Sequence, residues 1–74
     1  MKLPQISGLD LIKILTKFDF KVIRRRGSHV RLEKIIVGEV IRLTVPLHDI
    51  LKKGTLLHII KDSKIPEKEL ERYL

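Results

Sequence analysis

The fold is decided by the stretch Phe20-Lys21-Val22-Ile23-Arg24-Arg25-Arg26-Gly27-Ser28-His29-Val30-Arg31-Leu32-Glu33-Lys34. The hydrophobic period becomes two at its start, which indicates a strand over residues 20–26 that ends in a basic run. Gly27-Ser28 is typical of a tight turn. After the turn Val30 and Leu32 alternate with polar residues, as the two faces of a second strand do. The stretch therefore predicts a β-hairpin with one apolar and one basic face.

A third strand follows over residues 40–45, after a turn predicted at residues 37–39. Its alternation places Ile41, Leu43 and Val45 on the apolar face and leaves Arg42 and Thr44 on the polar face. Pro46 cannot donate to a sheet ladder, so we expect the strand to end there. The three strands predict an antiparallel sheet with one face buried and one open.

Helices are predicted on both sides of these strands. Leu11, Ile14, Leu15 and Phe18 recur at helical spacing after Ser7, a good N-cap, and so indicate a helix over 8–18. A second helix is predicted over 55–61, after a connection at 47–53, with Leu56, Ile59 and Ile60 inward. Pro66 suits the first turn of a short last helix, 66–73. The order αβββα plus a short helix predicts an α+β domain of two layers, with the helices on one sheet face.

Composition limits both the size and the class of the protein. Its 74 residues make one domain, 1–74, with 43% hydrophobic residues and no cysteine for a disulfide or a thiolate metal site. Apolar runs are far shorter than a membrane span, and residues 1–15 lack the apolar core of a signal peptide. We therefore expect a cytoplasmic protein that does not enter membranes.

The charge balance points to a polyanionic partner. Sixteen Lys and Arg against nine Asp and Glu leave a formal net charge of +7. Such a field favours nucleic acid first and an acidic protein second, with an anionic membrane surface as a weaker alternative. The predicted polar face carries no aromatic residue on which bases could stack, which favours binding directed by backbone and shape, as in double-stranded-RNA-binding domains.

His29 is the first candidate for chemistry. Histidine can exchange a proton near neutral pH, and His29 follows the basic run Arg24-Arg25-Arg26 on the predicted polar face. An imidazole beside several cations is placed to take a proton from a nucleophile near a bound phosphate, whose developing charge the cations would stabilise. The alternative is an ordinary surface histidine, and spacing alone does not separate the two.

The other two histidines are weaker candidates. His48 follows the third strand, where it is either a second catalytic candidate or a loop residue that fixes the turn through backbone hydrogen bonds. His58, in the second helix, is expected at the core boundary without a chemical role. No HxH or HExxH motif and no carboxylate cluster is present, so we expect no metal site and no cofactor.

Phosphate binding has further candidates. Lys52 and Lys53 lie beside the predicted start of the second helix, where ammonium groups and free backbone N–H groups meet. Lys52-Lys53-Gly54-Thr55 lacks the first glycine of a nucleotide-binding loop, which excludes that motif. The alternative for these lysines, and for the run Arg24–Arg26, is a solvated basic surface. Ser28 and Arg31, which flank His29, complete the candidate RNA contacts.

Taken in order, these residues resemble the HicA (YcfA-like) toxins. The resemblance rests on the Gly27-Ser28-His29 turn, then Val45-Pro46-Leu47-His48, then Lys53-Gly54-Thr55-Leu56, and extends from Ser7 to Tyr73. It implies a fold like that of double-stranded-RNA-binding domains, and an mRNA interferase from a type II toxin–antitoxin pair. It also implies that His29 is the catalytic histidine and that a HicB antitoxin covers it. Many members have Ala-Gly where this chain has Ser63-Lys64, a departure at the predicted C-cap and not at the catalytic residues.

The residues and the resemblance together favour a metal-independent endoribonuclease that cleaves mRNA with His29 as general base. Water, a lysine or His48 is left as the general acid. The alternative from another class is a non-catalytic module that binds double-stranded RNA or other nucleic acid through the same cations. A third is a basic adaptor for an acidic protein. An adjacent short reading frame for an acidic antitoxin would favour the first.

Overall fold

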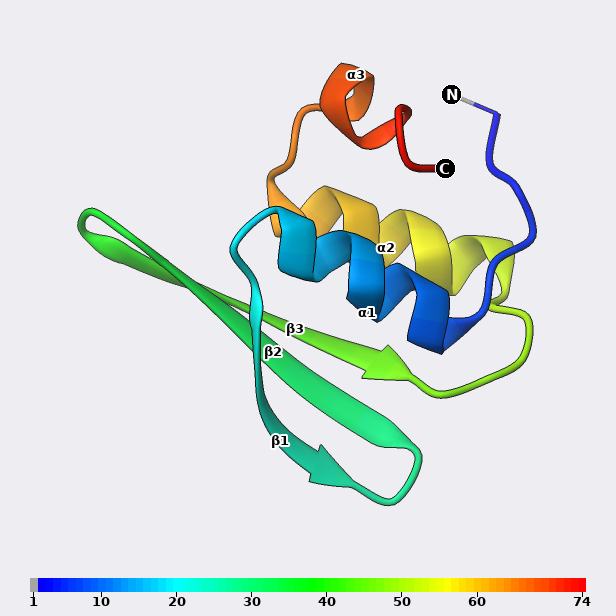
Figure 1. The fold of residues 1–74 in the computed structure, drawn as a ribbon, viewed down its shortest axis with the longest axis horizontal. Helices are drawn as coiled ribbons and strands as arrows, with labels where there is room; N and C mark the ends of the chain where they lie inside the picture. Colours follow the sequence, from blue (N-terminus) through cyan, green and yellow to red (C-terminus); the bar gives the residue numbers. More distant parts are fainter. Residues whose placement is uncertain (1) are drawn as a thin grey trace.

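The chain alternates between helical and extended periods, and its elements follow that alternation. The computed structural model describes residues 2–74 (Figure 1). The elements are α1 (Gly8–Lys17), β1 (Lys21–Arg26), β2 (His29–Ile36), β3 (Glu39–Pro46), α2 (Lys53–Ser63) and α3 (Glu67–Leu70). The predicted α+β class, the αβββα order and the three-stranded antiparallel sheet are confirmed. Within the described residues, every helix is too short or too polar to cross a bilayer.

β2 is the central strand, and two-residue turns join it to both neighbours. Arg26 pairs with His29 across Gly27-Ser28, and Gly27 has a φ of +59°, which places a glycine at the first position of the turn as type II′ hairpins require. Ile36 pairs with Glu39 across the second turn. The predicted turn at 37–39 is therefore one residue too long, because Glu39 already belongs to β3.

The core lies between one sheet face and the helices α1 and α2. Leu11 and Leu15 from α1 meet Leu32 and Val45 from the sheet and Leu56 from α2, and each is at most 1% exposed. The inward faces predicted for the strands and for both helices are confirmed. The opposite face of the sheet, here called the outer face, has no helix over it (Figure 1).

The helix boundaries differ from prediction by a few residues. Ser7 caps α1 as expected, its Oγ accepting a hydrogen bond from the Asp10 backbone N at 3.0 Å. α2 begins two residues early, at Lys53, and α3 is only a four-residue turn. Lys64 closes α2 with a φ of +59°, so a lysine takes the left-handed position that usually favours glycine. The departure at Ser63-Lys64 therefore leaves the cap geometry intact.

Candidate nucleic-acid interface and active site

His29 is the first residue of β2 and lies on the outer face. Its cross-strand partners are Arg26 on β1 and Pro46 on β3, and its side chain is exposed. Arg31, two residues further along β2, occupies the same face because side chains alternate along a strand. We call this part of the outer face, next to the β1–β2 turn, the turn end. At the turn end, the accessible imidazole of His29 therefore lies beside the guanidinium groups of Arg26 and Arg31.

Four exposed cationic or ionisable side chains share the turn end. Arg24 pairs with Arg31 just as Arg26 pairs with His29, and directly paired residues project to the same side. We call Arg24, Arg26, His29 and Arg31 the cationic cluster. Glu33, the next outward residue of β2, does not neutralise it, because its Oε2 lies 3.1 Å from Nε of Arg42 on β3. The cluster is therefore an open positive surface suited to an anion.

A β-bulge in β1 determines which side chains join the cluster. The register shifts between Val22 and Arg24, with Val22 opposite buried Leu32 and Arg24 opposite exposed Arg31. In a regular strand two residues that are two apart share a face, so the extra residue, Ile23, is what turns Arg24 outward. Bulges leave no clear trace in a single sequence. The alternation within residues 20–26 could not have shown this change of face.

The run Arg24–Arg26 consequently divides between two sides of the sheet. Arg25 pairs with Val30, whose side chain faces the core, and so projects away from His29 at the edge of the sheet. Its Nε donates to the Gly27 carbonyl at 3.1 Å, across the turn that precedes His29. Arg25 also lines a shallow depression with Ser7 and His48. Two of the three predicted arginines therefore accompany His29, and the third lies beside α1.

Backbone contacts hold the turn end against α1 and the end of β3. The Leu47 N–H donates to the Ser28 carbonyl at 2.6 Å, and the Gly8 N–H donates to the His48 carbonyl at 2.9 Å. A Cβ on Gly8 would lie 1.9 Å from the Pro46 carbonyl oxygen, so only glycine fits there. Sequence reasoning missed this role of Gly8. Its one available signal was a glycine directly after a good N-cap.

His48 and Ser28 contribute to this support through their main chains. The His48 carbonyl binds Gly8, which agrees with the alternative that His48 fixes the turn, while its exposed imidazole borders the depression with Arg25. The Ser28 carbonyl binds Leu47, and its side chain is exposed beside His29. Both side chains are therefore accessible, Ser28 next to His29 and His48 on the side of Arg25 and α1.

Lys52 and Lys53 lie at the start of α2, as the N-cap and the first helical residue, where the prediction had them in the connection just before the helix. Lys52 is the N-cap without a side-chain hydrogen bond, and the first turn of α2 has no acidic residue. Both lysines are exposed. Figure 1 places the start of α2 at the same end of the molecule as the end of β3 and the β1–β2 turn. The lysines thus lie on the helical layer beside the turn end, and not on the outer face itself.

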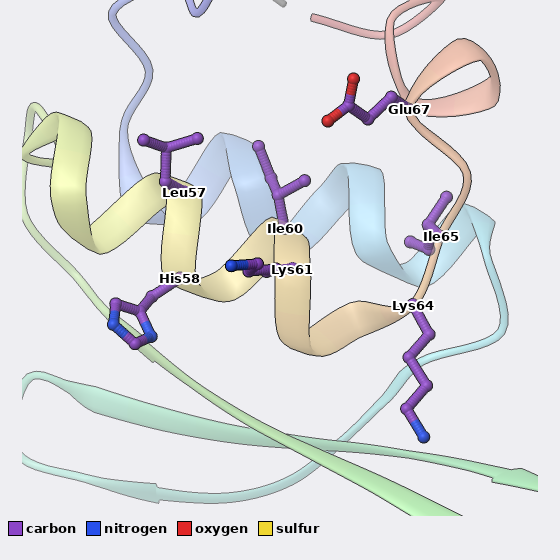
Figure 2. A pocket seen from close by; sticks show the side chains of 7 residues that line it. All are labelled: Leu57, His58, Ile60, Lys61, Lys64, Ile65 and Glu67. Atoms are coloured by element: carbon purple, nitrogen blue, oxygen red, sulfur yellow. The ribbon is translucent and has the colours of Figure 1, made fainter.

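His58 lies in a different place from the other two histidines. It is exposed, so the prediction of a core-boundary position is wrong, although the next two residues of α2, Ile59 and Ile60, are buried. Figure 2 shows it beside Leu57 and Ile60 at a groove of about 490 Å³ between α2 and the segment leading into α3. None of the candidate site residues lines this groove. Among residues 2–74, no three His, Asp or Glu side chains are grouped as metal ligands would be.

Fold and site define a small basic α+β domain with an open sheet face that carries a histidine among arginines. The family model described as HicA toxin of bacterial toxin–antitoxin matches residues 8–65, which include every element except α3. The chain therefore belongs to the HicA toxin family. Neither the curated proteins nor the solved structures contain a match to it.

Proposed function

We propose that the protein is the toxin of a type II pair and acts as an mRNA interferase, an endoribonuclease that needs no metal ion. The observation that carries this proposal is the cationic cluster, in which exposed His29 has Arg26 directly opposite and Arg31 on the same face. Membership of the HicA toxin family supports the toxin role and a cognate antitoxin. The expected place of action is the cytoplasm, where mRNA is the substrate.

The proposed chemistry uses the 2′-hydroxyl of RNA as its own nucleophile. His29 takes the 2′-hydroxyl proton, O2′ attacks the adjacent phosphorus, and the bond from phosphorus to the 5′ oxygen of the next nucleotide breaks. The leaving oxygen takes a proton from a general acid, for which His48 is the candidate side chain and water the alternative. The products are a 2′,3′-cyclic phosphate and a 5′-hydroxyl. DNA lacks the nucleophile and would not be cleaved.

The arginines bind and stabilise the reacting phosphate. Arg24, Arg26 and Arg31 would neutralise the extra negative charge that develops on the phosphate oxygens in the transition state. Arg25, Ser28, Lys52 and Lys53 would hold neighbouring phosphates of the chain, because they surround the turn end without joining the outer-face cluster. Such contacts fix the position of the backbone and carry little sequence information.

A matched pair of histidine variants tests the proposal. The purified protein is incubated with mRNA in EDTA as wild type, as His29→Ala and as His58→Ala, since His58 is equally exposed but lies on α2. We expect cleavage by the wild type and by His58→Ala, and a rate about 10²- to 10⁴-fold lower for His29→Ala. Cleavage at the wild-type rate by folded His29→Ala would contradict the role of His29. Activity lost in EDTA and restored by Mg²⁺ would contradict metal independence.

The same incubation separates the enzyme from a module that only binds RNA. A binding module would retain salt-dependent RNA affinity but leave every transcript intact, with or without EDTA. The antitoxin is expected to be HicB-like, acidic where it meets the cationic cluster, and to cover His29. A structure of the complex with His29 open to solvent would contradict that part of the proposal.

A further inference from the structure

The β2–β3 hairpin carries a group of exposed aliphatic side chains at the end remote from His29. Ile35 is 80% exposed and Val37, in the turn, is fully exposed. Val40, paired with Ile35 on the outer face, and Ile36, which projects to the opposite face, are partly exposed, and Ile23 lies close by on β1. Figure 1 shows this hairpin projecting past the helices into open space. We call Ile23, Ile35, Ile36, Val37 and Val40 the hairpin patch.

The fold itself does not account for this surface. Ile35 and Val40 pair directly on the outer face, next to the charged pair Glu33 and Arg42. Lys64 of α2 reaches the hairpin through Glu39, but the aliphatic side chains of the patch stay exposed beside this ion pair. Contiguous exposed aliphatic residues at the edge of a sheet are typical of interaction sites, because uncovered they favour aggregation.

RNA does not explain the patch either. Aliphatic side chains neither neutralise phosphate nor offer the aromatic surface on which bases stack. A protein surface gains free energy by covering them, at about 25 cal/mol for each Å² of apolar area removed from water. The occupant is therefore a protein.

Ile35 and Val40 of the hairpin patch lie on the same sheet face as the cationic cluster. His29, Arg31, Glu33 and Ile35 follow one another on the outer side of β2, and His29 lies about 20 Å from Ile35 along the strand. A partner of ordinary size covers roughly 800 Å² on each side of a stable interface. A protein that lies over His29 along β2 therefore reaches the patch.

A notch beside the patch offers a place for a partner side chain. β1 begins to pair with β2 only at Lys21 and Glu33, so the β1-side edge of residues 34–36 has no strand partner. A depression of about 430 Å³ lies at this step, with Ile23, Ile35 and Ile36 among its lining residues. Charged residues make up the rest of its lining: Asp19, Lys21, Glu33 and Lys34. An extended segment with apolar and charged side chains fits this depression and the free edge.

We infer that the cognate antitoxin gains most of its affinity at the hairpin patch, and that acidic groups of the antitoxin meet the cationic cluster at the other end. This inference rests on the proposed function, because only a catalytic role of His29 makes the cationic cluster the surface that an antitoxin must block. Charge favours the antitoxin over a second copy of this chain, because another copy would lay its own +7 charge across a cationic face. The patch contributes affinity that does not depend on salt. The cationic cluster raises the rate of association, and this increase becomes smaller as the salt concentration rises.

The experiment compares the double variant Ile35→Gln/Val37→Gln with Leu57→Gln, a partly exposed leucine on α2. Each protein is titrated with the separately purified cognate antitoxin in a calorimeter, at low and at high salt. We expect the double variant to bind about 100-fold more weakly, with a steeper relative loss at high salt, and Leu57→Gln to bind like the wild type. Val37→Gln alone, at a fully exposed turn position, should bind about tenfold more weakly and cannot disturb the core.

Three results would overturn the inference. They are unchanged affinity of the double variant, a larger loss in Leu57→Gln, and a wild type that is a dimer while the double variant is a monomer by light scattering. The last result would assign the patch to a second copy. RNA cleavage by each free variant is measured in parallel and should equal that of the wild type. Absence of cleavage by all of them, wild type included, together with the expected order of antitoxin affinities, would overturn the proposed function and not this inference.

Discussion

The two ends of the outer face differ in charge, in support and in proposed use, although one strand connects them. At the turn end, the cationic cluster is exposed and the backbone is fixed to α1 and to the end of β3. At the hairpin end, the exposed groups are aliphatic, and an ion pair between Lys64 and Glu39 links the hairpin to α2. A catalytic group must be held in place, whereas a docking hairpin only needs to be reachable. The difference in support matches the difference in task.

The largest expected effect is that substitutions at the two ends change different properties, RNA cleavage at the turn end and antitoxin affinity at the hairpin end. His29→Ala should lower RNA cleavage by about 10²- to 10⁴-fold, the usual contribution of a general acid or base, while antitoxin affinity changes by less than about threefold. Ile35→Gln/Val37→Gln should instead lower the antitoxin affinity and leave the rate of RNA cleavage unchanged. Cleavage rates and calorimetric affinities of both proteins check this, and circular dichroism confirms that both are folded. Loss of both properties in either variant would mean that the ends do not act separately.

The second prediction concerns the support of the turn end. Gly8→Ala should lower the free energy of unfolding by about 1–3 kcal/mol, because its Cβ would lie 1.9 Å from the Pro46 carbonyl oxygen. Gly54→Ala is the matched control, since nothing lies within 4 Å of a Cβ there and the position is helical. It should raise stability by about 0.5–1 kcal/mol. Urea denaturation measures both, and equal effects of the two substitutions would show that the packing at Gly8 is not tight.

The third prediction asks how far the phosphate-binding surface extends beyond the cluster. Lys52→Ala/Lys53→Ala should weaken RNA binding roughly tenfold and make the slope of log affinity against log salt shallower by about 0.7 for each phosphate that the variant no longer binds. Cleavage at saturating RNA should fall less than in His29→Ala, because the proposed base remains. Lys61→Ala/Lys68→Ala removes two exposed lysines elsewhere and serves as control. An unchanged salt slope in Lys52→Ala/Lys53→Ala would show that these lysines are solvated and do not bind phosphate.

Strong periodicity explains why the fold was predictable from the sequence. Val30 and Leu32 alternate with His29 and Arg31, and their faces are as predicted, because burial of one face fixes the register of a strand. The stretch that decides the fold ends at Lys34, and β2 continues beyond it to Ile35, an exposed aliphatic residue on the outer face. Alternation shows which residues share a face. It does not show that a chain leaves an apolar residue uncovered for a partner.

The sequence indicated which residues are candidates for the site but not how the fold arranges them. The basic run before His29 and the alternation that places His29 and Arg31 on one face were enough to select these two residues, and the structure places both on the outer face. The separation of Arg25 from Arg24 depends on the bulge at Ile23, and the close approach of α1 depends on Gly8, which are both tertiary features without a local signature. The roles of the site residues stay predictions until cleavage and binding by their variants are measured.

The smallest expected effect concerns the link at the hairpin end. Lys64 has a φ of +59° at the C-cap of α2, and its Nζ reaches Glu39 on β3. Both Lys64→Gly and Lys64→Ala remove that ion pair, which contributes at most about 1 kcal/mol because both side chains are largely exposed. Only alanine retains the steric cost of a Cβ in the left-handed region.

We therefore expect Lys64→Gly to be more stable than Lys64→Ala by about 1 kcal/mol in urea denaturation. The comparison between the two variants cancels the missing ion pair and reports the backbone alone. Antitoxin affinity of Lys64→Gly then shows whether the ion pair matters for docking. If the hairpin is held mainly by the pairing between β2 and β3, affinity stays within about twofold of the wild type, since a flexible surface ion pair orders little. A loss as large as that of Ile35→Gln/Val37→Gln would instead make the link from α2 to the hairpin part of the docking surface.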